Sequence, residues 1–223
     1  MSIFEIIAAY HSAFLSGLLT TLKLSTVIWS AGVTVGALLG VMAHRQPNIL
    51  GIPTKTASFI MGSVPVLVFL FWLHFPLAEL GLRLPPFWSA SIALSVVNIL
   101  AVADIVRHAL EEFPQEYLVV ARISGLTRNQ ALRHIQFPLI IRHILPALIT
   151  TQVTMLQATL FASLISVDEI FRTAQSINAR IYRPIQIYTA LGILFLLVCG
   201  PIQGLALFLK HRFGRKLAEL TSR

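Results

Sequence analysis

The sequence has little charge and almost no cysteine. Only 12% of its 223 residues are charged, about half the share in a typical soluble domain, whereas 56% are hydrophobic and the mean hydropathy is +0.79. Cys199 is the single cysteine, so the chain forms no intrachain disulfide. This composition excludes a disordered chain, a disulfide scaffold and a collagen-like fibre, and it predicts a membrane protein.

The short motifs of common catalytic and metal sites are also missing. The sequence has no glycine-rich phosphate loop ending in Gly-Lys-Ser or Gly-Lys-Thr, no His-Glu-x-x-His, no Cys/His cluster and no Gly-x-Ser-x-Gly elbow. We therefore predict that the chain is not an enzyme and holds no catalytic residue, no metal and no cofactor. The chain therefore does not bind ATP through a phosphate loop.

Five stretches lack Asp, Glu, Lys and Arg and are long enough to cross a bilayer, which takes about 20 helical residues. Buried helices of a soluble protein seldom supply so many. We predict an all-α integral membrane protein in which residues 1–223 form one transmembrane domain. Five spans are expected at about 14–44, 56–80, 84–107, 143–167 and 184–210, with a long loop at 108–142.

Lys and Arg are unevenly distributed over the connections between these spans. The side that holds the long loop and the C-terminus has twelve basic residues, and the other side has four. Because cytoplasmic loops accumulate Lys and Arg, we predict an N-terminus outside and a C-terminus in the cytoplasm. This bias accounts for the formal net charge of +8, so membrane lipid is expected as a partner and nucleic acid is not. The twelve are Arg45, Lys55, Arg107, Arg122, Arg128, Arg133, Arg142, Lys210, Arg212, Arg215, Lys216 and Arg223.

The long loop between the third and fourth spans has the pattern of a helical hairpin. Pro114 suits the first turn of one helix, and Gly125 can take the left-handed conformation that ends it. Thr127 and Gln130 form a capping-box pattern that opens a second helix, which we expect to end before Pro138. Such a hairpin either rests on the bilayer surface or docks a cytoplasmic partner.

The spacing of Gly125, Pro138 and Pro146 resembles the EAA loop found in inner-membrane permease subunits of ATP-binding-cassette importers. Further segments are similar to those of polar amino-acid permeases and follow in the same order along the chain. The similarity covers roughly residues 14–215, nearly the whole sequence. The similar segments are residues 16–25, 62–68, 103–107 and 177–184.

The resemblance implies a multi-pass permease of the bacterial inner membrane whose loop forms a coupling helix on a cytoplasmic ATPase. The Glu-Ala-Ala of the family falls on Val-Val-Ala at 119–121, and Glu116, nearly one helical turn earlier, either replaces the missing glutamate or does not. The implied partners are an ATP-binding-cassette ATPase dimer, a second permease (the same chain or a sister chain) and an extracytoplasmic solute-binding protein. The coupling candidates are Glu116, Ala121, Gly125, Pro138 and Pro146.

Polar residues inside the predicted spans are candidates for a solute path, because polar groups are costly in lipid. Asn98, Gln157 and Thr159 either line a path for a polar solute or bond one helix to another. Asp104 and Arg107 stand three residues apart on one helical face, where they form a structural ion pair or take part in gating. The Lys-Asp-Thr-Ser segment of the family falls on residues 157–160, where only the threonine is kept.

The outer connection after the fourth span carries Asp168, Glu169 and Arg172. The resemblance places a contact with the solute-binding protein there, and a solvated loop is the alternative.

The leading hypothesis is a permease subunit of a binding-protein-dependent, ATP-driven importer that forms the path for an amino acid or a similar small polar solute. One alternative is a stand-alone channel or ion-coupled secondary carrier, although the halves of the sequence show no internal repeat of the kind many carriers have. The other alternative is a membrane anchor without any transport path.

Overall fold

A computed structural model describes residues 3–221, without the side chains of Arg128 and of residues 214–221. Arg223, and the side chains of Arg128, Arg215 and Lys216 in the charge count above, lie outside this description. All secondary structure between residues 3 and 221 is helical, which confirms the all-α prediction. The elements are α1 (Ile3–Ala9), α2 (His11–Arg45), a π-helical turn η1 (Pro47–Gly51), α3 (Ile52–Ser63), α4 (Val66–Glu79), α5 (Pro86–Glu111), α6 (Gln115–Ile123), α7 (Arg128–Ala131), a second π-helical turn η2 (Leu132–Gln136), α8 (Phe137–Ala158), a 3-10 helix η3 (Thr159–Ile165), α9 (Ile170–Ile181) and α10 (Pro184–Thr221).

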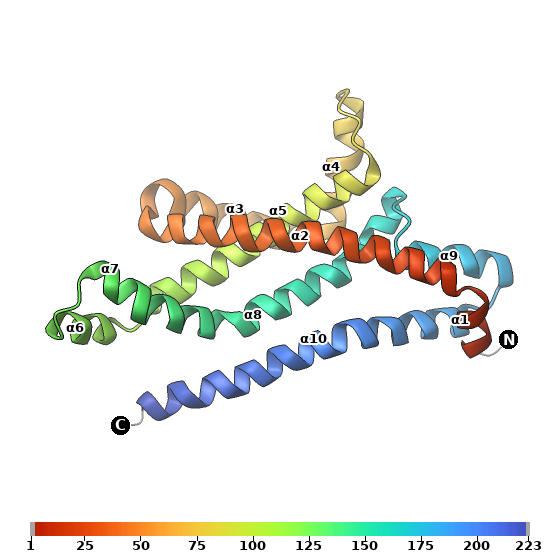
Figure 1. The fold of residues 1–223 in the computed structure, drawn as a ribbon. Coiled ribbons are helices and arrows are strands. Elements are labelled where there is room, and N and C mark those ends of the chain that lie inside the picture. The colour runs from red at the N-terminus through yellow and green to blue at the C-terminus, as the bar shows by residue number, and fades with distance from the viewer. Residues whose placement is uncertain (1–2, 222–223) are drawn as a thin grey trace.

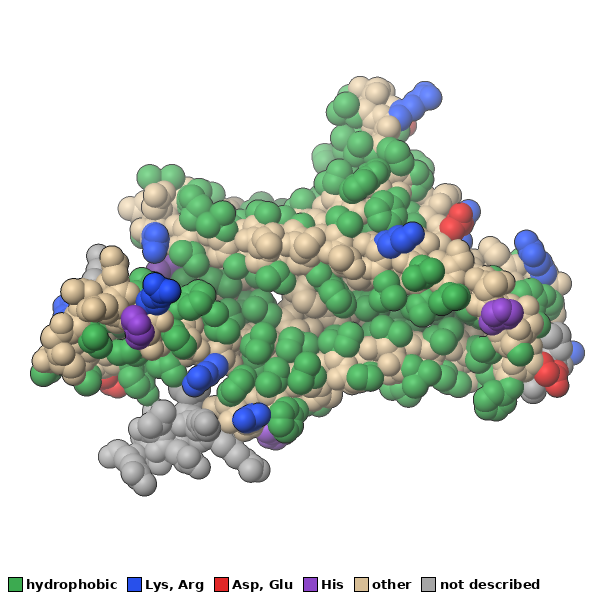
Figure 2. Space-filling view, viewed as in Figure 1, with side chains coloured by type: hydrophobic (Ala, Val, Ile, Leu, Met, Phe, Trp, Pro, Cys, Tyr) green, Lys and Arg blue, Asp and Glu red, His purple; other side chains and the backbone are tan. Residues whose placement is uncertain are grey.

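Long helices run side by side along the molecule, with α6 and α7 at one end and α1 and α9 at the other (Figure 1). Four described stretches are long and apolar enough to cross a membrane, and a bent helix pair supplies a fifth if it crosses as one span. Hydrophobic side chains are spread along the whole long-helix surface that Figure 2 shows, and charged ones gather near its ends, as expected for a surface that faces lipid. The four stretches are His11–Arg45, Pro86–Glu111, Asn129–Ile165 and Pro184–Phe213.

The second predicted span is not one straight helix. One half is α3 together with the preceding η1, and the other half is α4. The two halves meet at an angle of 98°. Val64 between them is extended, with φ −94° and ψ 126°, because a residue before proline avoids the helical region and Pro65 has no N–H to donate. As a result α4 leaves the line of α3 and projects from the bundle while it packs beside α5 (Figure 1).

Helices α2 and α5 pack closely through glycines on α2. Gly32, Gly36 and Gly40 are buried at four-residue intervals and face α5. A Cβ on Gly36 would stand 2.7 Å from the Ile99 carbonyl oxygen, and one on Gly40 would stand 2.6 Å from that of Ala103. Small residues at this spacing let two membrane helices approach each other closely. This stripe was not predicted, although its spacing is visible in the sequence.

The first helix of the predicted hairpin is α6. Pro114 directly precedes it, and Gly125 follows its end with φ +77°, in the left-handed region. The N–H of Gly125 donates to the Arg122 carbonyl oxygen and that of Leu126 to Ala121, each at 3.0 Å, which is the Schellman pattern. The expected stop of this helix at Gly125 is therefore confirmed.

The second helix of the hairpin begins as expected but does not end where expected. The Thr127 N–H donates to Gln130 Oε1 at 2.9 Å, and the Gln130 N–H donates to Thr127 Oγ1 at 3.4 Å, so the capping box forms. The helix then passes through η2 into α8, and the prediction of an end before Pro138 is wrong. The wider π-helical turn ends at Gln136, two residues before Pro138, whose ring cannot fit a regular helix interior.

This continuity shortens the expected loop at 108–142 and lengthens the fourth span. Helix α5 reaches Glu111, and the apolar stretch of the fourth span starts at Asn129. Pro146 consequently lies buried inside α8 rather than at the start of a span.

Candidate functional site

The α6 helix carries one anchored face and one free apolar face. Tyr117 and Leu118 pack against a buried cluster that includes Phe113 at the end of α5 and Ile140 of α8. On the other side, large apolar side chains have no cover within the described chain. These are Val119, Val120 and Ile123, with exposed fractions of 52%, 62% and 81%.

The coupling candidates fall into two groups. Glu116 and Gly125 are exposed at the two ends of α6, and Ala121 between them is buried. Pro138 and Pro146 both belong to α8, outside the hairpin tip. An apolar, exposed helix face at the end of the bundle is what a partner protein can cover, so α6 with Glu116 and Gly125 forms the candidate docking element.

Asp104 and Arg107 form the expected ion pair, and two more residues extend it. Arg107 Nη2 donates to Asp104 Oδ1 at 2.8 Å, and Arg107 Nη1 donates to Glu111 Oε2 at 3.0 Å. Glu111 Oε1 in turn lies 3.4 Å from Lys55 Nζ, on α3. The contact between Lys55 and Glu111 was not predicted from the sequence, because no sequence pattern brings α3 next to the end of α5.

Asn98 belongs to a buried network that joins three helices. Its Nδ2 donates to the Ile28 carbonyl oxygen of α2 at 3.0 Å and to Gln152 Oε1 of α8 at 2.9 Å. Gln152 Nε2 returns a bond to Asn98 Oδ1 at 3.3 Å, and Trp29 Nε1 donates to the Gln152 carbonyl oxygen at 2.9 Å. Of the two roles considered for Asn98, this geometry favours helix-to-helix bonding. Gln152 was missed because nothing separates it in sequence from other polar residues of α8.

Gln157 differs from the other path candidates because it lines an open groove. The groove runs between α8 and α10 and has a volume of about 470 Å³, a size that suits a small ligand. Thr159, by contrast, is fully buried, and its hydroxyl donates to the Leu156 carbonyl oxygen at 2.6 Å. The polar lining residues are Thr150, Thr154, Gln157 and Gln203, beside an apolar lining that includes Phe195 and Leu196.

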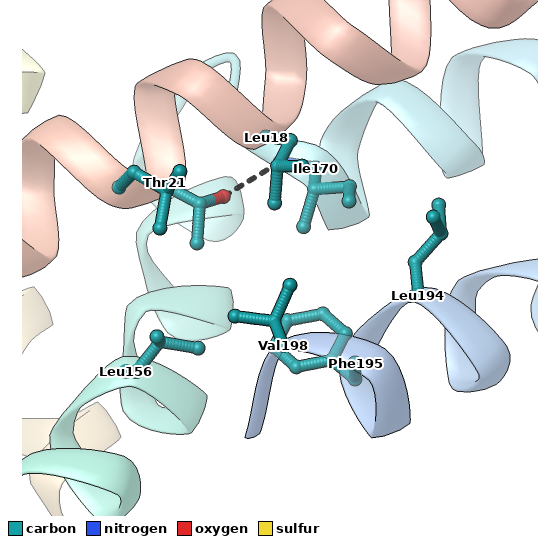
Figure 3. Close-up of a pocket in the computed structure, with 8 residues that line it drawn as sticks. Leu18, Thr21, Leu156, Ile170, Leu194, Phe195 and Val198 are labelled. Carbon is teal, nitrogen blue, oxygen red and sulfur yellow. Dashed lines mark hydrogen bonds between the residues drawn. The ribbon is translucent and has the colours of Figure 1, made fainter. Parts of the chain in front are cut away.

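A second, smaller pocket is apolar. It lies where α2, α8, α9 and α10 meet, and Figure 3 shows Leu156, Phe195 and Val198 pointing into it. Its one polar lining side chain, Thr21, already accepts a hydrogen bond from the Ile170 N–H at 3.2 Å. This pocket offers nothing to hold a polar solute.

The outer connection is more buried than the sequence suggests. Glu169 is fully buried at the start of α9, where its carboxylate accepts from the N–H groups of Phe171 and Arg172 at 2.8 Å each. Burial raises the pKa of Glu169 from 4.5 to about 7, against the lowering effect of these bonds and of the Arg172 charge. Asp168 is exposed and accepts from Arg172 Nε at 2.8 Å. Of these three residues, Glu169 is therefore not free to meet an outside partner.

Comparison with known proteins adds independent information. A family profile described as binding-protein-dependent transport system inner membrane component matches residues 32–215. The probable glutamine ABC transporter permease protein GlnP of Bacillus subtilis strain 168 is 27% identical over 180 residues, covering 79% of this chain and 83% of that protein. The octopine transport system permease protein OccM of Rhizobium meliloti is 29% identical over 193 residues, covering 82% of this chain and 79% of that protein.

A solved structure has the same fold. The crystal structure of an amino acid ABC transporter with histidines superposes with a TM-score of 0.84 at 25% identity, and the match covers 94% of this chain and 98% of that chain. The region matched by the family profile, residues 32–215, includes the α6 hairpin, α8 and the groove residues.

Proposed function

The chain belongs to the family of binding-protein-dependent transport system inner membrane components and is a membrane permease subunit, and we propose that it carries an amino acid or similar small polar solute across the membrane in an ATP-driven importer. The chain is a transport protein rather than an enzyme. In this proposal the ATP binds only to partner ATPase subunits, and no cofactor binds this chain.

The observation that carries the proposal is the free apolar face of α6. Val119, Val120 and Ile123 project from the end of the bundle, while Tyr117 and Leu118 hold the helix to α5 and α8. A cytoplasmic ATPase dimer docks here, one subunit on each permease, and covers the three exposed side chains. Movement of the ATPase then reaches the spans through the anchored face of α6.

The solute path lies along the groove between α8 and α10. Gln157, Thr150 and Thr154 supply amide and hydroxyl groups that can bond a polar solute, and Phe195 and Leu196 supply apolar contacts. The groove is open on one side within this chain, so a second permease subunit closes it. That subunit is a second copy or a sister chain. Two of the relatives are named for glutamine and octopine, which supports an amino-acid-like solute here.

The chain is an integral inner-membrane protein by its family, and its orientation is part of the proposal. The α6 end carries Lys55 and Arg122 and faces the cytoplasm, where basic residues accumulate. The α9 end then faces outwards, where a solute-binding protein delivers the solute near the exposed Asp168.

The proposal is tested by purifying the tagged chain from its native membranes in mild detergent and identifying the bound proteins by mass spectrometry. The expected result is an ATPase that contains a phosphate loop. The variant Ile123→Asp should lose this ATPase, because a carboxylate cannot be buried unpaired in an apolar interface. The matched control is Leu80→Asp, since Leu80 is 80% exposed but lies in the connection between α4 and α5.

A stand-alone carrier predicts a different outcome. In that case the chain would purify without an ATPase and would still move solute into vesicles from which ATP is removed while the membrane potential is held. Both results together would contradict the importer proposal.

A further inference from the structure

Four charged side chains form a continuous series of contacts outside the docking face and the groove. The contacts run from Asp104 to Arg107 at 2.8 Å, from Arg107 to Glu111 at 3.0 Å, and from Glu111 to Lys55 at 3.4 Å. We call these four residues the α3–α5 ion chain. Two of its members are acidic and two are basic, so the group is neutral as a whole.

The two basic members of the ion chain differ in burial. The Arg107 side chain is only 4% exposed, and its Nε has no hydrogen-bond partner within the described part of the protein. A buried guanidinium is costly unless carboxylates hold it, so Asp104 and Glu111 fix Arg107 in place. Lys55 is 52% exposed, so its contact with Glu111, which joins α3 to α5, is the solvent-accessible end of the ion chain.

The ion chain lies at the junction between α3 and the docking element. Glu111 is the last residue of α5, and the buried Phe113 follows two residues later. Phe113 packs with Tyr117 of α6 and Ile140 of α8 in one apolar cluster. A displacement of α6 therefore reaches the end of α5 through Phe113, and the contact between Glu111 and Lys55 is the charged link that passes it on to α3.

This position matters because α3 is the half of the bent pair that lies along the bundle. Its other end turns by 98° into α4 at Pro65, so α3 can move as a separate piece. Without a polar link, α3 would meet α5 only through side-chain packing in the lipid phase, where apolar contacts give little preference for one partner over lipid.

We propose that Arg107 and Glu111 are positioning residues that, through Lys55, make α3 move together with α5 when the ATPase displaces α6. The inference rests on the proposed function, and it adds a second output to the coupling element: the bent span, beside the spans that α6 contacts directly. Loss of the Lys55 contact should leave ATP hydrolysis running while less solute crosses for each ATP consumed.

The test uses the complete complex in proteoliposomes, with its ATPase and solute-binding protein, and a radiolabelled mixture of the common amino acids as probe. The measured quantity is the amount of label accumulated per ATP hydrolysed. Lys55→Met should lower this ratio by about fivefold, the lower end of usual coupling between distant sites, while hydrolysis stimulated by the binding protein stays within twofold of the parent. Glu111→Gln should do the same, because the amide keeps a bond to Arg107 but loses the charge that holds Lys55.

Two controls separate positioning from general damage. Lys55→Arg keeps the charge and should restore the parent ratio. Lys210→Met makes the same substitution on α10, outside the ion chain, and should change nothing. A parent ratio in Lys55→Met would overturn the inference, and so would a parallel fall of hydrolysis and uptake, which is what a folding or docking defect produces.

A cross-link gives a second, independent readout. In a chain with Cys199→Ser, the pair Lys55→Cys and Glu111→Cys is joined by a short bifunctional thiol reagent. If α3 and α5 move together, the covalent link replaces the ion pair and restores the ratio. If the link stops the cycle, the two helices must separate during transport and the inference is wrong. Failure of the proposed function appears earlier, as a parent complex whose uptake does not depend on ATP, and that result would overturn both.

Discussion

Helices α2 and α5 pack so closely that one added methyl group should destabilise the fold. Replacing Gly36 by alanine adds a Cβ that would lie 2.7 Å from the Ile99 carbonyl oxygen and 2.8 Å from Val102 Cβ. Ordinary contacts of a Cβ begin near 3.4 Å, so the two helices must separate by about 0.7 Å or deform locally. The carbonyl belongs to a helix backbone and cannot turn away as a flexible side chain can.

The loss of stability in Gly36→Ala is best measured against alanine at a glycine that has free space around it. Overpacking of this kind costs about 1–3 kcal/mol, against which alanine gains up to about 1 kcal/mol over glycine in helix propensity. A Cβ added at Gly204 of α10 would meet nothing within 4 Å, so Gly204→Ala receives the gain without the cost. The free energies of unfolding of the two variants should therefore differ by about 1–3 kcal/mol. At roughly 2–4 °C per kcal/mol, Gly36→Ala should melt about 2–12 °C below Gly204→Ala.

Thermal unfolding of the purified chain in detergent measures this difference. The unfolding is followed by the loss of the helical circular dichroism signal. Equal melting temperatures for Gly36→Ala and Gly204→Ala would refute the close approach of α2 and α5 on which the fold depends.

Three further predictions concern the docking element, the buried network and the outer connection. Gly125→Val forces a β-branched residue into a left-handed conformation at about 1–2 kcal/mol or more, so ATP-driven uptake should fall while the melting temperature of the spans stays unchanged; a parent uptake rate would contradict the role of the α6 end. Asn98→Leu leaves the Gln152 amide unpaired and should lower the free energy of unfolding by about 1–3 kcal/mol. Gln157→Leu in the open groove should instead reduce uptake without loss of stability. Equal effects of the two variants on the melting temperature would contradict the buried network. The pKa of Glu169 is about 7 in the folded chain and 4.5 in the unfolded chain. The neutral carboxyl therefore contributes about 3 kcal/mol to the free energy of unfolding, fully present below pH 4.5 and lost as the pH rises through 7. The melting temperature should fall between about pH 5 and 8, and Glu169→Gln should flatten that part of the pH profile.

Local features of the fold could be predicted from the sequence because their causes are local. Long uncharged runs predict apolar helices, Gly125 predicts a helix end, and the Thr127 and Gln130 pattern predicts a cap; each depends on residues at most a few positions apart. The pair of Asp104 and Arg107 follows from helical spacing in the same way.

Features that join distant residues could not be predicted in this way. Asn98 and Gln152 are 54 positions apart and meet only because α5 and α8 cross there. Glu169 resembles a solvated loop residue in sequence, and it is buried because α9 docks on α2. The bend at Pro65 had a local signal, which the unbroken hydrophobicity on both sides concealed.

The central claim is that ATP hydrolysis on a partner docked at α6 moves solute through this chain. The most direct test measures amino-acid accumulation and ATP hydrolysis together in proteoliposomes that hold the complete complex, with the parent chain and with Ile123→Asp. The account predicts accumulation that requires ATP in the parent and is lost, together with stimulated hydrolysis, in Ile123→Asp. Accumulation that continues after ATP is removed, or that survives Ile123→Asp unchanged, would contradict it.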